Sequence, residues 1–206
     1  MEEKRNFDLL TLGQVLLRLS PPNNDRLVRG DTFVKQVGGA ELNVAVGVAL
    51  LGLRTGVISK LPSHDMGSFM KGKIRSYGVS DDFFMYDDSP SARVGIYYYE
   101  NGAYPRKPKV IYDRANSSFY SLKIDEIPEK AYTASRCFHT SGITLALSPK
   151  VRETTIEMIK RFKAAGTLVS FDVNFRGNLW TGEEAKECIE QILPYVDIFF
   201  CSEDTA

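Results

Sequence analysis

Three polar side chains follow an apolar run of the sequence at every second position. Asp172, Asn174 and Arg176 come directly after residues 167–171, which have the length and apolar character of a buried strand. At alternate positions of an extended chain they can share one face, and open parallel sheets bind ligands at the carboxyl ends of their strands. A carboxylate, an amide and a guanidinium group there could hold a small polar molecule. The alternative is a structural turn closed by Asp172.

Two adjacent glycines precede a helix that we expect over residues 40–51. Gly38 and Gly39 would let a ligand approach the N–H groups at the amino terminus of this helix, where polar and anionic oxygens are favoured. Asn43, in the first turn, could donate its amide to a hydroxyl group. A tight turn without any ligand is the alternative, because a glycine pair serves either purpose.

Aromatic and basic side chains gather between residues 93 and 114. Tyrosine rings and hydroxyls, together with guanidinium groups, suit a small polyhydroxylated ligand, particularly one with a carboxylate. Strand alternation puts Tyr97 and Tyr99 on one face and Tyr98 on the other, so only one set can face a pocket while the other packs against a core or a partner. The members of this group are Tyr97, Tyr98, Tyr99, Tyr104, Tyr112, Arg93, Arg106 and Arg114.

Other catalytic patterns are missing from the sequence. His64 and His139 are the two histidines, and neither accompanies a serine or cysteine nucleophile in a triad pattern, so we do not expect a hydrolase. Cys137, Cys188 and Cys201 form no C-x-x-C pair and adjoin apolar residues, which predicts buried thiols rather than a zinc or redox site. No G-x-G-x-x-G follows the first expected strand, which disfavours a dinucleotide-dependent oxidoreductase.

The elements that must position these residues alternate between strands and helices. This order favours an α/β fold with a mostly parallel sheet and helices on both faces. Two stretches, about 13–37 and 93–112, instead have the pattern of antiparallel hairpins and would form a small separate sheet. That sheet could cover a cleft as a lid or pair with a second subunit. The sequence predicts strands over 7–12, 55–58, 137–140, 167–171 and 198–201, and helices over 40–51, 67–77, 150–164 and 182–193.

Composition limits the classes of function. The 206 residues include 26 basic and 26 acidic ones, so the chain lacks the positive charge expected of a nucleic-acid binder. The hydrophobic fraction of 43% can form one core of ordinary size. No apolar run approaches the ~20 residues that cross a membrane, and the charged amino terminus has no signal-peptide pattern. We therefore expect a cytoplasmic protein with no membrane and no nucleic-acid partner.

Three segments resemble one family. Gly38–Gly52 (GGAELNVAVGVALLG) resembles the first signature of the ribokinase-like (pfkB) carbohydrate kinases, and the resemblance extends over essentially the whole chain. Phe171–Trp180 (FDVNFRGNLW) resembles the D-x-N-x-R…L-W stretch of the family's 2-keto-3-deoxygluconate kinase and fructokinase branch. Residues 111–114 (IYDR) resemble the Tyr/Arg element with which 2-keto-3-deoxygluconate kinases hold a sugar acid.

The resemblance implies a ribokinase-like fold, in which the two hairpins form a β-sheet lid that in many members also builds a homodimer. It implies transfer of the γ-phosphoryl group of ATP, with Mg²⁺, to a primary hydroxyl group of a sugar or sugar acid. The arginines at positions 114 and 176 would pair with the carboxylate of an acid. The implied substrate-binding residues are Gly38, Gly39, Asn43, Tyr97, Tyr112, Arg114, Asp172, Asn174 and Arg176.

One part of the family pattern is missing. The D-T-x-G-A-G-D motif, which in the family supplies the catalytic aspartate and an anion hole, occurs nowhere in the 206 residues. We therefore expect residues 1–206 to be the amino-terminal part of a ribokinase-like domain without the ATP-binding part. Such a chain would bind sugar weakly and would not turn over, and no metal ligand is assigned. The alternatives are a kinase for a neutral ketose such as fructose, and a non-catalytic sugar-binding or dimerisation module.

Overall fold

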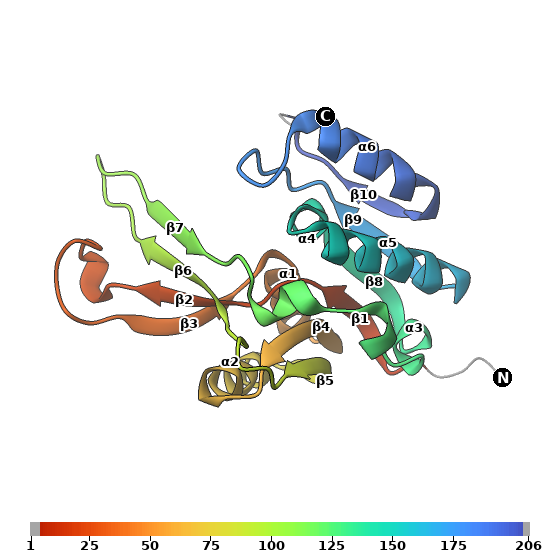
Figure 1. Ribbon diagram of the computed structural model, residues 1–206, viewed down its shortest axis with the longest axis horizontal. Helices are drawn as coiled ribbons and strands as arrows, with labels where there is room; N and C mark the ends of the chain where they lie inside the picture. Colours follow the sequence, from red (N-terminus) through yellow and green to blue (C-terminus); the bar gives the residue numbers. More distant parts are fainter. Residues whose placement is uncertain (1–4, 204–206) are drawn as a thin grey trace.

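A parallel six-stranded sheet is the larger of two sheets in the computed structural model, which describes residues 5–203 (Figure 1). The strand order is β10-β9-β8-β1-β4-β5, and every neighbouring pair runs parallel. The mostly parallel sheet predicted from the alternation of elements is therefore confirmed. Its strands are β1 (Phe7–Leu12), β4 (Thr55–Pro62), β5 (Val79–Asp87), β8 (Ser135–Ser141), β9 (Leu168–Asp172) and β10 (Ile198–Phe200).

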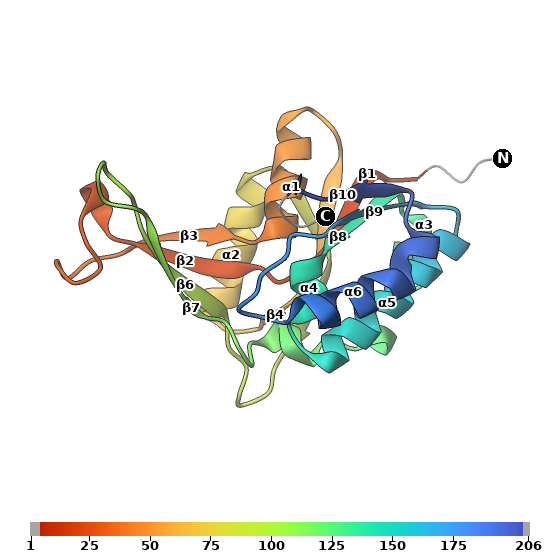
Figure 2. The same ribbon diagram turned by 90° about the horizontal axis from the view of Figure 1, so that it is seen from above.

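Helices cover both faces of this sheet, with α1 on one face and α5 and α6 on the other (Figure 2). Strand alternation explains the two layers. Leu10, Leu12 and Ile58 are buried in one cluster, while Val57 and Leu61 are buried in the other. The helices are α1 (Ala40–Leu50), α2 (Asp65–Ser76), α3 (Lys130–Thr133), α4 (Gly142–Ala146), α5 (Pro149–Ala164) and α6 (Gly182–Ile192).

A smaller four-stranded sheet projects from the larger one (Figures 1 and 2). Its order is β3-β2-β6-β7, and the pairs β2–β3 and β6–β7 are the two antiparallel hairpins expected from the sequence. The hairpins join through a parallel pairing of β2 with β6, so the small sheet is mixed. We call this sheet the lid sheet. Its strands are β2 (Leu16–Ser20), β3 (Val34–Gly38), β6 (Gly95–Glu100) and β7 (Lys109–Asp113).

The structure corrects the sequence prediction at several places. β5 and α4 were not expected, and β4 continues four residues past the expected end at position 58. Cys188 is buried as predicted, but Cys137 is partly exposed and Cys201 is exposed, because it follows the edge strand β10. Among residues 5–203, no helix combines the length and the apolar character needed to cross a membrane.

Candidate functional site

The two adjacent glycines join the lid sheet to α1, and each allows a close approach. A Cβ atom at Gly38 would lie 2.5 Å from the hydroxyl oxygen of Tyr97. Gly39 has a φ of +151°, which other residues rarely adopt, and a Cβ atom there would lie 2.7 Å from the carbonyl oxygen of Gln14. Gly39 precedes α1 without a side-chain cap, so N–H groups of the first turn are left for another partner. Asn43 is exposed in the same part of α1.

Tyr97 and Tyr112 form one aromatic pair across the lid sheet. The two residues are directly paired in register between β6 and β7, and their ring centroids are 6.0 Å apart. The Tyr97 hydroxyl is the group that approaches Gly38, so this pair lies at the glycine turn. Burial raises the pKa of Tyr97 above its ordinary value, which keeps the hydroxyl protonated and able to donate a hydrogen bond.

Arg114 follows the end of β7 and is held beside this aromatic pair. Its guanidinium carbon lies 5.5 Å from the centre of the Tyr112 ring, and its Nε donates a hydrogen bond to Oε1 of Gln14 over 2.8 Å. Burial lowers the pKa of Arg114, but an arginine stays charged at neutral pH. Among residues 5–203, Nη1 and Nη2 make no hydrogen bond and no ion pair. The N–H groups of both terminal nitrogens therefore stay available to an anion.

Gln14 and Glu41 were not predicted from the sequence as site residues, and both lie next to this cluster. Gln14 donates from Nε2 to the carbonyl oxygen of Arg114 and to the Ser117 hydroxyl. Glu41, in the first turn of α1, is 2% exposed. A glutamate two positions after a glycine pair, in a mainly apolar helix, is the sequence signal that could have been followed.

The carboxylate of Glu41 connects α1 to the carboxyl end of β8. Its Oε1 accepts hydrogen bonds from the hydroxyls of Ser141, at 2.6 Å, and Thr144, at 2.7 Å. A Cβ atom at Gly13 would lie 2.2 Å from Oε2, so only glycine leaves room for this carboxylate beside the end of β1. Burial raises the pKa of Glu41, although both hydroxyl donors oppose that shift.

The polar residues after β9 are organised differently. Asp172 accepts a hydrogen bond from the backbone N–H of Asn174 over 3.1 Å, which is the turn considered as the alternative for this segment. Asn174 has a φ of +36°. Arg176 is exposed and donates to the carbonyl oxygen of Phe175, its neighbour in sequence. No hydrogen bond or ion pair in the described part of the chain joins these three to Arg114.

The two groups of residues are nevertheless linked through the main sheet. Ser141 pairs in register with Asp172, and the Ser141 hydroxyl donates to Glu41 at the start of α1. The loop between β9 and α6, which carries Arg176, extends toward the side of the molecule that holds the lid sheet (Figures 1 and 2). The structure thus brings Gly38, Tyr97, Tyr112 and Arg114 together and leaves Arg176 at the end of a separate loop.

A family model described as pfkB family carbohydrate kinase matches residues 6–206. The chain belongs to the pfkB family of carbohydrate kinases. The resemblance of Gly38–Gly52 to the first signature of the family, noted above, is confirmed by this match, which covers both the glycine turn and the strand end. The fold is the ribokinase-like fold, with the parallel sheet and the lid sheet in the expected places.

Two curated members of the pfkB family are similar over most of this chain. It is 38% identical over 196 residues to a 2-dehydro-3-deoxygalactonokinase of Haloferax volcanii, a match that covers 95% of this chain and 61% of that protein. It is 30% identical over 197 residues to a 2-dehydro-3-deoxygluconokinase of Bacillus subtilis, covering 94% and 60%. The chain therefore spans less than two thirds of the length of these relatives.

The crystal structure of a 2-dehydro-3-deoxygluconokinase from Thermotoga maritima has the same fold. It superimposes with a TM-score of 0.89 at 37% sequence identity, covering 94% of this chain and 59% of that one. A putative 2-keto-3-deoxygluconate kinase from Enterococcus faecalis superimposes with a TM-score of 0.88 at 28% identity, covering 96% and 58%. The similarity to both structures extends over the large sheet and the lid sheet of this pfkB chain.

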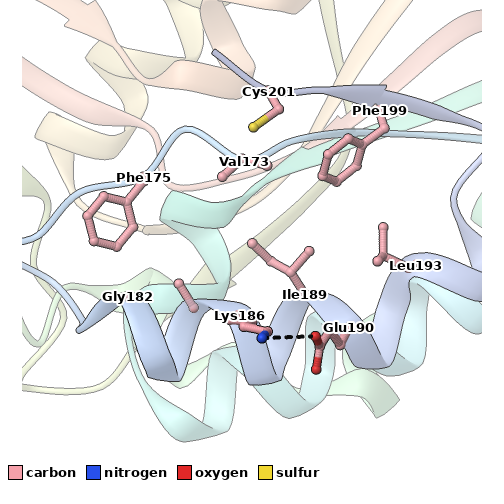
Figure 3. Close-up of a pocket in the computed structure, with 10 residues that line it drawn as sticks. Val173, Phe175, Gly182, Lys186, Ile189, Glu190, Leu193, Phe199 and Cys201 are labelled. Carbon is pink, nitrogen blue, oxygen red and sulfur yellow. Dashed lines mark ion pairs between the residues drawn. The ribbon is translucent and has the colours of Figure 1, made fainter. Parts of the chain in front are cut away.

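A hollow of about 540 Å³ lies between α6 and the strands β9 and β10, beside the segment that carries Asp172, Asn174 and Arg176 (Figure 3). Phe175, Ile189 and Phe199 point into it, and the charged side chains on its rim include Lys186 and Glu190, which form an ion pair. The lining is mainly apolar and contains none of the residues predicted to bind substrate. This hollow does not have the hydrogen-bonding groups that a polyhydroxylated sugar needs.

Proposed function

We propose that this chain forms the sugar-binding part of a kinase that transfers the γ-phosphoryl group of ATP to a hydroxyl group of a 2-keto-3-deoxy sugar acid. 2-Keto-3-deoxygluconate (2-dehydro-3-deoxygluconate) is the first substrate to test. The similarity of the chain to the 2-dehydro-3-deoxy sugar acid kinases of Haloferax volcanii, Bacillus subtilis and Thermotoga maritima supports this substrate class. The location that we propose for the protein is the cytoplasm.

The orientation of Arg114 and its unbonded terminal nitrogens are the observation that supports the proposal most directly. Its Nε is fixed by Gln14, its guanidinium carbon lies 5.5 Å from the centre of the Tyr112 ring, and its terminal nitrogens make no hydrogen bond to the described residues. A guanidinium fork held in this way binds a planar carboxylate with two parallel hydrogen bonds. A neutral ketose has no group that would use this fork equally well, so Arg114 favours a sugar acid over fructose.

The remaining predicted residues would hold the hydroxyl groups of the sugar acid. The N–H groups at the start of α1, after Gly38 and Gly39, would donate to oxygen atoms near the glycine turn. Asn43 and Tyr97 would add an amide and a hydroxyl on the same side. Asp172, Asn174 and Arg176 would bind from the opposite side, after the loop that carries Arg176 moves toward the ligand.

ATP supplies the phosphoryl group in the proposed reaction. The substrate oxygen forms a bond to the γ-phosphorus, the bond to the β-phosphate oxygen of ADP breaks, and the hydroxyl proton leaves with a base. We assign no catalytic residue within the chain, because the family's D-T-x-G-A-G-D motif does not occur in it. No group of three or more His, Cys, Asp or Glu side chains among residues 5–203 could hold a metal ion, so no step is assigned to Mg²⁺.

Calorimetric titration with 2-keto-3-deoxygluconate and with fructose tests the proposal. We expect the chain to bind the acid more tightly, and Arg114→Ala to weaken acid binding at least about tenfold while changing fructose binding little. Arg29→Ala is the matched control, because Arg29 is an exposed arginine in the segment between β2 and β3. An equal loss for both ligands in Arg114→Ala would favour the neutral-sugar kinase. Coupled ATP consumption by the full-length protein then tests the transfer step.

The lid sheet supports a second proposal, that two copies of the chain form a homodimer. Exposed apolar side chains lie on or beside its strands, among them Phe33, Val34, Val110 and Ile111. Apolar side chains that gather on a sheet are typical of a surface that a partner covers. Light scattering on the purified protein should give twice the mass of the chain. A monomer at all accessible concentrations would contradict the dimer.

A further inference from the structure

Gln14 occupies the point where the chain crosses from the large sheet to the lid sheet. It lies between the end of β1 at Leu12 and the start of β2 at Leu16, and it is only 3% exposed. The chain leaves the lid sheet for the last time after β7, at Arg114, and Gln14 is hydrogen-bonded to Arg114. One buried carboxamide therefore connects the first entry of the chain into the lid sheet with its last exit.

The Gln14 carboxamide holds both the main chain and the side chain of Arg114. Its Oε1 accepts from Arg114 Nε at 2.8 Å, and its Nε2 donates to the Arg114 carbonyl oxygen at 3.1 Å and to the Ser117 hydroxyl at 2.6 Å. Only one orientation of the amide allows this, because a guanidinium group can donate but never accept. Both N–H groups of the amide are used, so a rotation would leave buried donors without acceptors.

Two glycines in the neighbouring backbone leave room for Gln14. A Cβ atom at Gly95, the first residue of β6, would lie 2.9 Å from Nε2 of Gln14 and 3.5 Å from Cα of Arg114. Any larger residue at position 95 would push against the amide. The carbonyl oxygen of Gln14 also faces Gly39, where a Cβ atom would come within 2.7 Å. Gln14 thus lies against both the arginine and the glycine turn.

The neutrality of Gln14 matters for what Arg114 can bind. The amide fixes the direction of the guanidinium group without cancelling its charge, and it occupies only Nε. Neither Glu41 nor Tyr120 makes a hydrogen bond to Arg114. A carboxylate at position 14 would instead pair with the guanidinium and compete with a ligand for the same positive charge.

We propose that Gln14 is a positioning residue, which aims the free edge of Arg114 at the ligand and thereby sets the preference for a sugar acid over a neutral sugar. This inference rests on the proposed function for its ligand and on the hydrogen bonds above for its geometry. It predicts that a change of Gln14 alters the ratio of the two affinities, whereas loss of a purely structural residue would weaken both ligands together.

The first test compares Gln14→Glu with Gln191→Glu, which introduces the same charge at an exposed position of α6. Calorimetry with 2-keto-3-deoxygluconate and fructose gives the ratio of affinities. Gln14→Glu should weaken acid binding about tenfold and leave fructose binding within about twofold, and Gln191→Glu should change neither. An unchanged ratio in Gln14→Glu, with acid binding by the wild type, overturns this inference and leaves the proposed function intact.

The second test needs no ligand. The Nε–Hε resonance of Arg114 can be identified in ¹⁵N-arginine-labelled protein by its loss in Arg114→Lys. Gln14→Leu should shift this resonance and speed its exchange with water, because the acceptor is gone, while Gln191→Leu should leave it unchanged. If the wild type binds no sugar acid, the proposed function fails, and a changed Nε–Hε exchange still supports the positioning of Arg114 by Gln14. A resonance that does not respond to Gln14→Leu overturns the positioning role.

Discussion

The candidate site has two sides, and they are held in place in different ways. On the lid side, Arg114 is bonded to Gln14 from another element, and Tyr97 packs against Tyr112 and the glycine turn. On the strand-end side, after β9, the hydrogen bonds of Asp172 and Arg176 go to residues one or two positions away. The side chains on the lid side are therefore held by tertiary contacts, and those of Asp172 and Arg176 by local hydrogen bonds.

This difference has a consequence for binding. A side chain that is already oriented loses little conformational freedom when a ligand binds, whereas an exposed arginine on a loop must be ordered at that moment. We therefore expect the lid side to supply most of the affinity for a sugar acid. The strand-end side should respond to the ligand and contribute less.

The largest effect should come from a change of the glycine turn. Gly39→Ala forces a φ of +151° on a residue with a side chain and brings its Cβ within 2.7 Å of the Gln14 carbonyl oxygen. It should lower the free energy of unfolding by about 2–3 kcal/mol and abolish sugar-acid binding. Urea unfolding followed by the fluorescence of Trp180, the single tryptophan, measures the stability.

The matched control lies on the strand-end side. At Gly177 a Cβ atom would meet the Phe175 ring at 3.6 Å, an ordinary contact. Gly177→Ala should therefore change the free energy of unfolding by less than about 0.5 kcal/mol. Equal losses of unfolding free energy in the two variants would mean that the two sides of the site are equally constrained, which would contradict the difference between them.

The order of strands and helices could be predicted from the sequence, because apolar periodicity is a local property. β5 was missed for a local reason too. Asp81 and Asp82 interrupt its apolar alternation, and the structure shows that Asp81 is paired with Lys71 and Arg75 of α2. An acidic residue in an edge strand can be satisfied by the helix that covers it, and this pairing cannot be seen in the sequence.

The candidate site could be predicted only in part, because some of its contacts join residues far apart in the chain. The glycine turn was predicted from a motif, and Tyr97 and Tyr112 were predicted as binding residues from the family resemblance. Gln14 and Arg114 are 100 positions apart, as are Glu41 and Ser141. No spacing rule connects such residues, so the groups that orient the predicted binders were found only in the structure.

The second largest effect should be a difference between Arg114 and Arg176 in their contribution to the affinity for the sugar acid. Arg176 is exposed and its Nη1 donates only to the adjacent carbonyl oxygen of Phe175, so its guanidinium group is not aimed at the lid side. Arg176→Ala should weaken binding of 2-keto-3-deoxygluconate about threefold, against at least about tenfold for Arg114→Ala. Calorimetry on both variants makes the comparison. A loss as large as that of Arg114→Ala would show that the strand-end side is ordered before the ligand arrives.

The smallest predicted effect concerns the pH dependence of the free energy of unfolding. The stability contributed by Glu41 should fall as the pH rises, and that contributed by Asp197 should fall as the pH is lowered. Burial raises the pKa of Glu41 above its usual 4.5, so the folded protein binds this proton more tightly than the unfolded chain does. The stability that this group contributes is complete below pH 4.5 and is lost as the pH rises through the raised pKa. Glu41→Gln keeps an acceptor for Ser141 and Thr144 and removes the titration. Its stability relative to the wild type should therefore increase with pH above 4.5.

Asp197, between α6 and β10, should behave in the opposite way. The Lys163 ammonium group and the backbone N–H of Val169 lower the pKa of Asp197 below its usual 3.8. Its contribution is therefore present above pH 3.8 and is lost as the pH falls through the lowered pKa. Asp197→Asn should lose stability relative to the wild type at neutral pH and approach it in acid. Urea unfolding of the wild type and both variants from pH 3 to pH 8 measures the two slopes. If the stability of both variants relative to the wild type changed with pH in the same direction, Glu41 would not be desolvated. That result would contradict a buried carboxylate between α1 and β8.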